Sequence, residues 1–267
     1  MRLRLNLLIG GTLLGIVTAI AITAAFWTPY APRAINLRRR LNAPSGTHWL
    51  GTDEFGRDVL SRLMVGAETS LTVAAVTVLV ALCIGVLIGL LAGFFRGWVD
   101  RALMALNDAL LAFPGILLAL GLLTVIGPSK WGIVLALGLA YAPAVARVVR
   151  GSVLSLRERE FIEASRALGN SELYTLWRHV LPNCVSPLTV LATSMFGWVI
   201  LSESALSFLG LGVPPPAPSW GNMLATARPF LESATWLSIA PGVMIALCLL
   251  GTNLLGDALR DWLDPRT

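Results

Sequence analysis

The chain is short of charge and has almost no lysine, histidine or cysteine. Charged residues occupy 13% of its 267 positions, Lys130 is the only lysine, and there are 2 histidines and 3 cysteines. Soluble domains carry about 25% charged residues, so this composition excludes an ordinary soluble protein. The cysteines form no CxxC or Cys/His spacing, so the sequence indicates neither a disulfide framework nor a zinc site. The net charge of +5 comes almost entirely from arginine, which in so apolar a chain indicates membrane orientation rather than nucleic-acid binding.

The motifs of common catalytic sites are missing as well. No GxxxxGK[ST], GxSxG or HExxH occurs, and the single lysine lies in Gly127–Lys130, which is not a phosphate-binding loop. His48 and His179 are expected on opposite sides of a membrane. We therefore expect a chain that is not an enzyme, with no catalytic residue, no cofactor and no metal site of its own.

Long apolar runs are what the sequence has instead. A run of about 20 apolar residues spans a bilayer as a helix, because hydrocarbon leaves no water for unpaired backbone groups. Six runs qualify: Leu7–Trp27, Leu71–Phe95, Ala102–Ile126, Trp131–Val149, Val185–Leu209 and Leu237–Leu255. They predict an all-α, polytopic membrane protein with six transmembrane helices. The third run is the least regular, because Asp108 and Pro114 interrupt it.

The first run has two interpretations. Arg2 and Arg4 precede an apolar stretch with small residues near Ala24, which also fits a signal peptide. The run is longer than the apolar part of such a peptide, which favours a retained helix.

Orientation follows from the arginines, which favour the cytoplasmic side. If both termini are cytoplasmic, the arginines of residues 2–4, 96–101 and 157–178 lie on the cytoplasmic side. The arginines of the C-terminal tail, Arg260 and Arg266, lie there too. Six arginines between the first two runs disagree with this topology: Arg33, Arg38, Arg39, Arg40, Arg57 and Arg62. We keep it because the reverse would place the polar stretch Glu163–Pro182 outside.

The extracytoplasmic segments divide the chain. Residues 1–70 would hold the first transmembrane helix and a long outer loop, and residues 71–267 the main transmembrane domain. The helical spacing of Leu60, Leu63, Met64, Ala67 and Leu71 predicts an amphipathic helix on the membrane at Arg57–Leu71. Between the last two runs, Pro214–Pro216 predicts a stiff extended segment, followed by a short helix near Trp220–Phe230.

The polar stretch Glu163–Pro182 interrupts the apolar runs and predicts two short helices. Phe161, Ala164 or Ser165, and Leu168 recur at helical spacing and give the first helix an apolar face. Gly169 can adopt the left-handed conformation that ends a helix, and Ser171 can cap the next one, with Glu172 in its first turn. This pattern alone fits an ordinary amphipathic loop as well as a docking surface.

Several stretches, read together, resemble one transporter family. Glu163-Ala164-Ser165, then Gly169, then His179-Val180-Leu181-Pro182 is similar to the EAA loop of ABC-importer permeases, with Ser165 and His179 as mild departures. Four further segments fit the same subfamily: Leu50–Asp58, Asp108–Pro114, Glu203–Pro214 and Gly256–Pro265. Nearly the whole chain resembles the C-type permease subunit of dipeptide, oligopeptide and nickel importers.

The resemblance implies a heteromeric importer in the bacterial inner membrane. This chain would pair with a B-type permease, two cytoplasmic ATPase subunits that bind ATP and Mg²⁺, and an extracytoplasmic solute-binding protein. The loop at about residues 155–182 would couple ATPase closure to the transmembrane helices. Its coupling residues would be Glu163, Ala164, Ser165, Leu168, Gly169 and Leu173. The cargo would be a dipeptide or oligopeptide, with nickel, glutathione or another small solute as alternatives.

Two acidic residues, Glu203 and Asp108, fall within the spans, where charge is costly and usually functional. They could face the translocation pathway, or they could be packing groups bonded to nearby serines such as Ser207. Used as proton relays, they would instead suit a proton-coupled secondary carrier. A membrane scaffold without transport is a third possibility, which such charges argue against.

Two features of the outer segments also have two interpretations. His48, Asp53, Glu54 and Asp58 could form a metal site, but Arg57 and Arg62 compete for these acids and favour an ion-paired loop. Trp220, Phe230 and Trp236 could contact a binding protein or form an interfacial aromatic belt.

Overall fold

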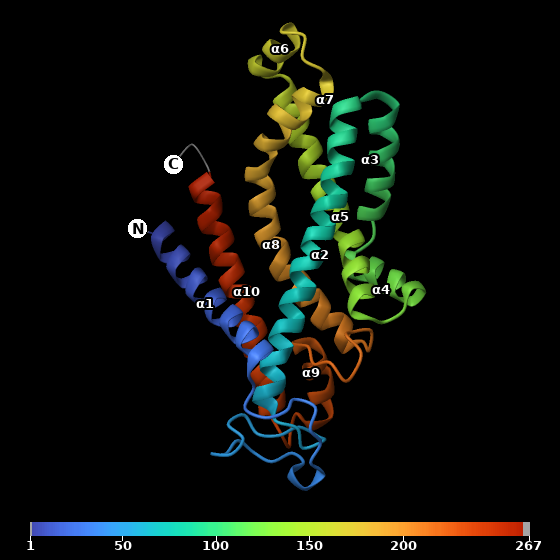
Figure 1. Ribbon diagram of the computed structural model, residues 1–267. Helices are drawn as coiled ribbons and strands as arrows, with labels where there is room; N and C mark the ends of the chain where they lie inside the picture. The colour runs from blue at the N-terminus through green and yellow to red at the C-terminus, as the bar shows by residue number, and fades with distance from the viewer. Residues whose placement is uncertain (1, 264–267) are drawn as a thin grey trace.

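The computed structural model describes residues 2–263, and this part of the chain is helical with a single isolated bridge between Thr52 and Asp58. The all-α prediction is confirmed. Ten α-helices are present in the described part (Figure 1): α1 (Arg2–Phe26), α2 (Val59–Phe95), α3 (Gly97–Leu111), α4 (Gly115–Ile126), α5 (Lys130–Arg157), α6 (Glu160–Ala167), α7 (Glu172–Thr175), α8 (Leu181–Phe208), α9 (Trp220–Ala227) and α10 (Trp236–Leu263). A π-helical segment, Leu176–Val180, joins α7 to α8.

Five described helices are long and apolar enough to cross a membrane, and α3 with α4 makes a sixth if the pair counts as one span. The predicted third span is therefore not one straight helix, because α3 and α4 meet at 94°. Pro114 is the cause: it has no backbone N–H to donate and disfavours helical geometry at Phe113. It stands at the N-cap of α4 with φ −54° and ψ 127°.

The amphipathic helix predicted at Arg57–Leu71 is not a separate element on the membrane surface. Its residues form the first turns of α2, which runs unbroken from Val59 to Phe95. Leu63, Met64 and Ala67 are buried, and the backbone carbonyl of Leu63 accepts a hydrogen bond from the Trp220 indole N–H at 3.3 Å. A Cβ at Gly66 would lie 3.2 Å from Cδ1 of Trp220, so this part of α2 packs against α9.

The packing of α2 on α5 forms the centre of the bundle. A Cβ at Gly85 would lie 2.5 Å from Cβ of Val145, and a Cβ at Gly89 would lie 2.7 Å from Cβ of Val149. Glycine at these positions lets the two backbones approach closely, as at tight helix contacts in membranes. A similar approach brings α1 against α10, where Gly10 faces the carbonyl of Gly251.

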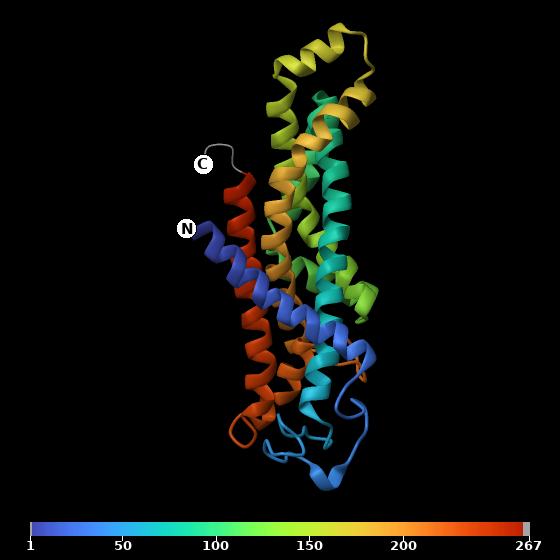
Figure 2. The same ribbon diagram turned by 60° about the vertical axis from the view of Figure 1, so that its left-hand side comes forward.

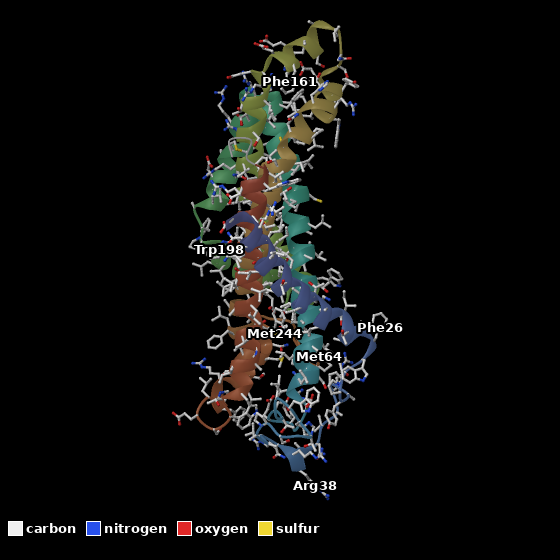
Figure 3. All side chains as sticks on the ribbon, turned by 90° about the vertical axis from the view of Figure 1, so that its left-hand side faces the viewer. Phe26, Arg38, Met64, Phe161, Trp198 and Met244 are labelled. Carbon is white, nitrogen blue, oxygen red and sulfur yellow. The ribbon has the colours of Figure 1, made fainter. Side chains whose placement is uncertain are left out.

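The molecule is elongated, with different segments at its two ends (Figures 1 and 2). Helices α6 and α7 form one end, and the segment of residues 28–58 forms the other, with α9 beside it. Figure 3 shows Phe161 near the first end and Arg38 at the second. Both ends of the described chain lie toward the α6–α7 side (Figure 2), as the six-span topology predicts. That this side is cytoplasmic stays a prediction, and Asp264, Pro265 and Arg266 lie outside the described residues.

Candidate functional site

The end of α6 is built around Gly169, which adopts the predicted left-handed conformation at φ +79°. Its N–H donates to the carbonyl of Arg166 at 2.9 Å, and the N–H of Asn170 donates to the carbonyl of Ser165 at 3.2 Å. These two bonds satisfy helix-end carbonyls in a Schellman motif. No atom lies within 4 Å of a Cβ placed on Gly169, so the backbone conformation rather than space requires glycine here.

The second helix of the stretch Glu163–Pro182 begins as predicted, but it continues into α8 instead of ending as a short helix. The Ser171 hydroxyl accepts a hydrogen bond from the N–H of Tyr174 at 3.2 Å, and Glu172 occupies the first turn. Instead of a separate short helix, residues 172–208 then form one continuous helical rod through the π-helical segment. The N–H of Leu181 donates to the carbonyl of Leu176, five residues earlier. Movement of the loop is thereby linked directly to α8.

The inward side of the loop is polar at its centre. Ser165 is buried and its hydroxyl lies 3.0 Å from that of Thr175, while the side-chain N–H of Asn170 donates to Ser165 Oγ at 3.2 Å. Of the predicted coupling residues, Ser165 therefore points inward and holds the two helices together. Of the predicted apolar face, Phe161 and Leu168 are exposed, whereas Ile162, outside that face, is buried.

The outward side of the loop carries apolar side chains without cover, which we name the docking surface. It consists of the following exposed residues: Phe161, Leu168, Leu173, Tyr174 and Trp177. Leu168 is 82% exposed. Three other predicted coupling residues, Glu163, Ala164 and Gly169, are also exposed on the same loop. Exposed apolar side chains grouped in this way mark an interaction site.

Charged residues fix the loop to the bundle. The Arg157 guanidinium donates to the backbone carbonyls of Phe94 and, at 3.3 Å, Gly93, which joins the end of α5 to the end of α2. Nε of Arg166 lies 3.2 Å from a carboxylate oxygen of Glu172 across the turn. The docking surface is thus held by a short, cross-linked hairpin.

The two intramembrane acids have different surroundings. Glu203 is 1% exposed, and its Oε1 accepts hydrogen bonds from the hydroxyls of Ser207 and Ser219, each at 2.8 Å. In this conformation it is a packing group between α8 and the start of α9, and contact with a solute would require these helices to separate. Asp108 is instead exposed on α3, where its Oδ1 lies 2.6 Å from Nη2 of Arg147 on α5.

Sequence reasoning missed the basic partners of the acids on α3. Arg147 pairs with Asp108, and Arg150 pairs with Asp100 at 2.5 and 2.7 Å. The available signal was Arg147 inside an apolar run, because an intramembrane arginine is costly unless a partner is near. Pairing across α3 and α5 depends on tertiary structure, so the sequence left the partner open.

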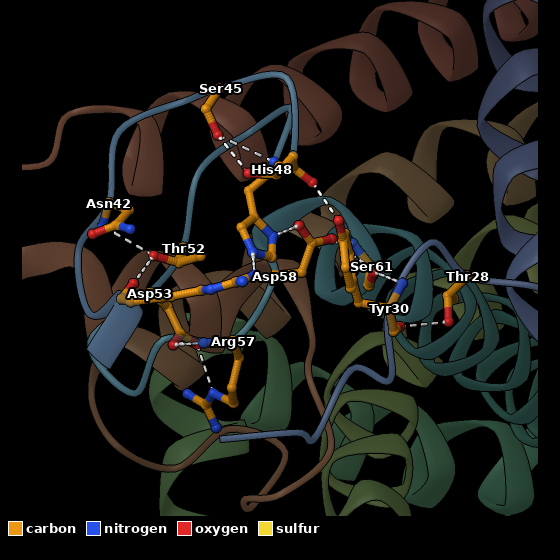
Figure 4. A network of polar contacts seen from close by, with 12 residues as sticks. Thr28, Tyr30, Asn42, Ser45, His48, Thr52, Asp53, Arg57, Asp58 and Ser61 are labelled. Atoms are coloured by element: carbon orange, nitrogen blue, oxygen red, sulfur yellow. Dashed lines mark hydrogen bonds and ion pairs between the residues drawn. The ribbon is translucent and has the colours of Figure 1, made fainter. Parts of the chain in front are cut away.

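The outer end holds a second polar cluster, shown in Figure 4. His48 Nδ1 lies 2.8 Å from Oδ1 of Asp58, whose Oδ2 accepts from the N–H and the hydroxyl of Ser61 at 2.8 and 2.7 Å. Asp53 pairs with Nε of Arg57 at 2.6 Å and lies 3.4 Å from Nε of Arg62. The ion-paired interpretation of this loop is therefore confirmed. Within residues 2–263 no group of three His, Cys, Asp or Glu side chains is arranged for a metal ion.

Of the three aromatic residues expected at the outer surface, Trp220 is buried and Phe230 and Trp236 are half-buried. Trp220 is completely buried, and its backbone N–H donates to the Ser70 hydroxyl at 3.1 Å. The Trp236 indole donates to the carbonyl of Thr52 at 3.4 Å. Trp220 is thus neither a docking residue nor part of an interfacial belt, because it fastens the start of α9 to α2.

The comparisons with known proteins decide the family. Residues 85–267 match the family described as binding-protein-dependent transport system inner membrane component. The chain belongs to this family. It is therefore a multi-pass inner-membrane permease subunit, as its apolar helices also indicate.

Curated relatives match over nearly the whole chain. A putative peptide transport system permease protein of Brucella suis is 43% identical over 97% of this chain and 87% of its own length. The dipeptide transport system permease protein of Alkalihalophilus pseudofirmus is 42% identical over 92% of this chain and 81% of its own. A glutathione transport system permease protein of Escherichia coli is 43% identical over 94% of this chain and 83% of its own.

Solved structures agree in fold. A chain of the methionine ABC transporter MetNI, in an inward-facing conformation, aligns with a TM-score of 0.62 over 76% of this chain and 96% of that one. At 20% identity this likeness concerns the fold alone.

Proposed function

We propose that this subunit forms half of the translocation pathway of an ATP-driven importer for short peptides. The docking surface is the observation that carries the proposal, because it presents uncovered apolar side chains on a hairpin continuous with α8. A cytoplasmic ATPase subunit that binds there can move α8 by closing on ATP. ATP and Mg²⁺ would bind to that subunit, and the docking surface and both termini would lie in the cytoplasm.

The remaining partners follow from the family's architecture. A second, B-type permease would supply the other half of the pathway, a second ATPase would serve it, and an extracytoplasmic binding protein would deliver the solute. Peptide is the favoured cargo because the names of the three relatives above specify peptide, dipeptide or glutathione, itself a small peptide. Nickel remains an alternative outcome of transport assays. A proton-coupled carrier is disfavoured, since it leaves the docking surface without a role.

Gly169→Val in the assembled transporter tests the coupling role. A β-branched residue at φ +79° costs about 1–2 kcal/mol of backbone strain, and it would turn the hairpin away from the ATPase. We expect ATP hydrolysis without peptide uptake, measured together in proteoliposomes as transported peptide per ATP.

Gly210→Val is the matched control. Gly210 ends α8 at the other end of the molecule with φ +84° and no atom within 4 Å of its Cβ. It carries the same backbone strain away from the docking surface, so the ratio of uptake to hydrolysis should stay near that of the wild type. Equal ratios for Gly169→Val and the wild type would refute the coupling assignment.

A further inference from the structure

Ion pairs join α3 to α5 at two heights, and the deeper pair is the more exposed. Asp100 and Arg150, near the α6–α7 end, have side chains 16% and 32% exposed. Asp108 lies about 12 Å farther along α3, at about 1.5 Å per residue, and it and Arg147 are 60% and 61% exposed. Asp108 and Arg147 are thus exposed although they lie deeper than Asp100 and Arg150, and the pair Arg96–Glu158 at the end of the bundle is exposed as well, at 50% and 79%.

The two pairs also differ in what they leave unbonded. Arg150 grips both carboxylate oxygens of Asp100, through Nε and Nη2 at 2.5 and 2.7 Å. Arg147 makes a single bond, from Nη2 to Oδ1 of Asp108 at 2.6 Å. No further side-chain hydrogen bond of this deeper pair is present in the described chain, so Oδ2 and the other guanidinium N–H groups remain available to a ligand.

The position of the open pair is fixed by its neighbours. Asn107 is buried, and its side-chain N–H donates to the carbonyl of Pro143 at 3.2 Å. Pro143 lies one helical turn before Arg147, so this bond sets the register of α3 on α5 beside the pair. The Asn107 bond thereby places the backbones that carry Asp108 and Arg147 next to each other.

Lipid is the wrong environment for such a pair. A charged side chain exposed to the hydrocarbon core costs several kcal/mol, so a pair that is 60% and 61% exposed at this depth requires water or a polar partner around it. A water-filled path satisfies both the exposure and the unused hydrogen-bonding groups.

We infer that Asp108 and Arg147 form a binding site on the wall of the translocation path for the charged ends of a zwitterionic peptide. At neutral pH a free peptide carries an ammonium at one end and a carboxylate at the other. Oδ2 of Asp108 can accept from the ammonium, and the free N–H groups of Arg147 can donate to the carboxylate. This inference rests on the proposed peptide-import function and names the residues of this chain that recognise the cargo.

Cysteine labelling in the complete transporter tests the site. Arg147→Cys would be placed in a background with Cys83, Cys184 and Cys248 replaced by alanine, and treated with a membrane-impermeant thiol reagent. Leu87→Cys, at an exposed apolar position of α2, is the control for a lipid-facing residue. We expect Arg147→Cys to react and Leu87→Cys not to react. An unreactive Arg147→Cys would place the pair in lipid or against the second permease and overturn the inference.

Protection and uptake test recognition. Dialanine at about ten times its dissociation constant should slow labelling of Asp108→Cys about tenfold, since about one site in ten stays free. Labelling that dialanine leaves unchanged would overturn the peptide site. Arg147→Gln should lower dialanine uptake about tenfold or more through loss of a charge-assisted bond, whereas Arg101→Gln, at an exposed arginine of α3, should not.

The failure of the proposed function would look different. A wild-type transporter that takes up no peptide would refute peptide import, while the reactivity of Arg147→Cys would still report whether the pair faces water. Normal wild-type uptake with equal uptake by Arg147→Gln would refute only the site.

Discussion

The two ends of the molecule differ in which side chains they bury and which they expose. At the outer end, buried polar groups such as His48, Asp58 and Ser61 are bonded to one another within the chain. At the α6–α7 end, apolar side chains such as Leu168 and Trp177 are exposed. The polar groups of the outer end are bonded within the single subunit, although apolar side chains such as Leu37 and Trp49 are exposed there too, whereas we propose that the docking surface is half of an interface. Substitutions at the first should therefore change folding, and those at the second should change assembly.

Asp58→Ala should have the largest effect and should act on stability. It removes the N-cap of α2 and leaves His48 Nδ1 and the Ser61 O–H without an acceptor or donor, although His48 Nε2 still lies 3.1 Å from Arg39 and Ser61 Oγ still accepts from the N–H of Tyr30. Losing a cap and stranding buried polar groups costs about 2–4 kcal/mol together. The midpoint of thermal unfolding of the purified transporter should fall by several degrees.

Asp58→Asn is the control for this variant, because it keeps an oxygen that can accept from the N–H of Ser61. It should lose less stability than Asp58→Ala. If Asp58→Ala unfolds with the wild type, the polar groups of the outer end do not stabilise the fold as described above.

Leu168→Ala should have a smaller effect, confined to assembly. The side chain is 82% exposed, so its removal should change the free energy of unfolding by less than about 0.5 kcal/mol. As a central apolar anchor of the docking surface it should weaken binding of the ATPase subunit about tenfold, measured by titration of that subunit onto the purified permeases.

Leu231→Ala, at an exposed leucine of the outer end, is the matched control and should leave ATPase binding unchanged. Equal weakening by both variants would show that a general loss of apolar surface, rather than docking, is responsible.

Local chemistry made much of the docking hairpin predictable. Gly169 and Ser171 were found from the sequence because a left-handed helix end and an N-cap each depend on a few adjacent residues. Membrane spans were found for a similar reason, since length and apolarity alone decide whether a helix can cross.

Apart from the bend at Pro114 and the helix that continues into α8, the errors concern which partner a residue meets. Leu63 and Met64 show helical spacing whether they face lipid or α9, so periodicity could not place them. Trp220 was assigned to the surface because tryptophan is common there, but it fills the space between α9 and α2. The sequence likewise did not show that the Ser165 hydroxyl lies 3.0 Å from that of Thr175; its coupling role stays a prediction. Tertiary packing, which no local pattern encodes, decided each case.

Glu54→Gln should have the smallest effect of these variants. It tests whether the stability of the outer end depends on pH. Burial raises the pKa of the Glu54 carboxyl above its usual value of 4.5, against the lowering effects of a backbone hydrogen bond and of Arg57. The folded state therefore holds this proton more tightly than the unfolded state. Its contribution to stability is present below pH 4.5 and is lost as the pH rises through the folded pKa.

Glutamine stays neutral, so the stability of Glu54→Gln relative to the wild type should grow as the pH rises from about 4 to about 7. Hydrogen exchange of backbone amides in residues 36–57 would measure this, because those amides report on the outer loop directly. Glu232→Gln, which removes a negative charge from an exposed turn, controls for net charge. If the stability of the wild type and that of Glu54→Gln change in parallel with pH, the assignment is contradicted. The pH dependence of the outer loop would then come from a group other than Glu54.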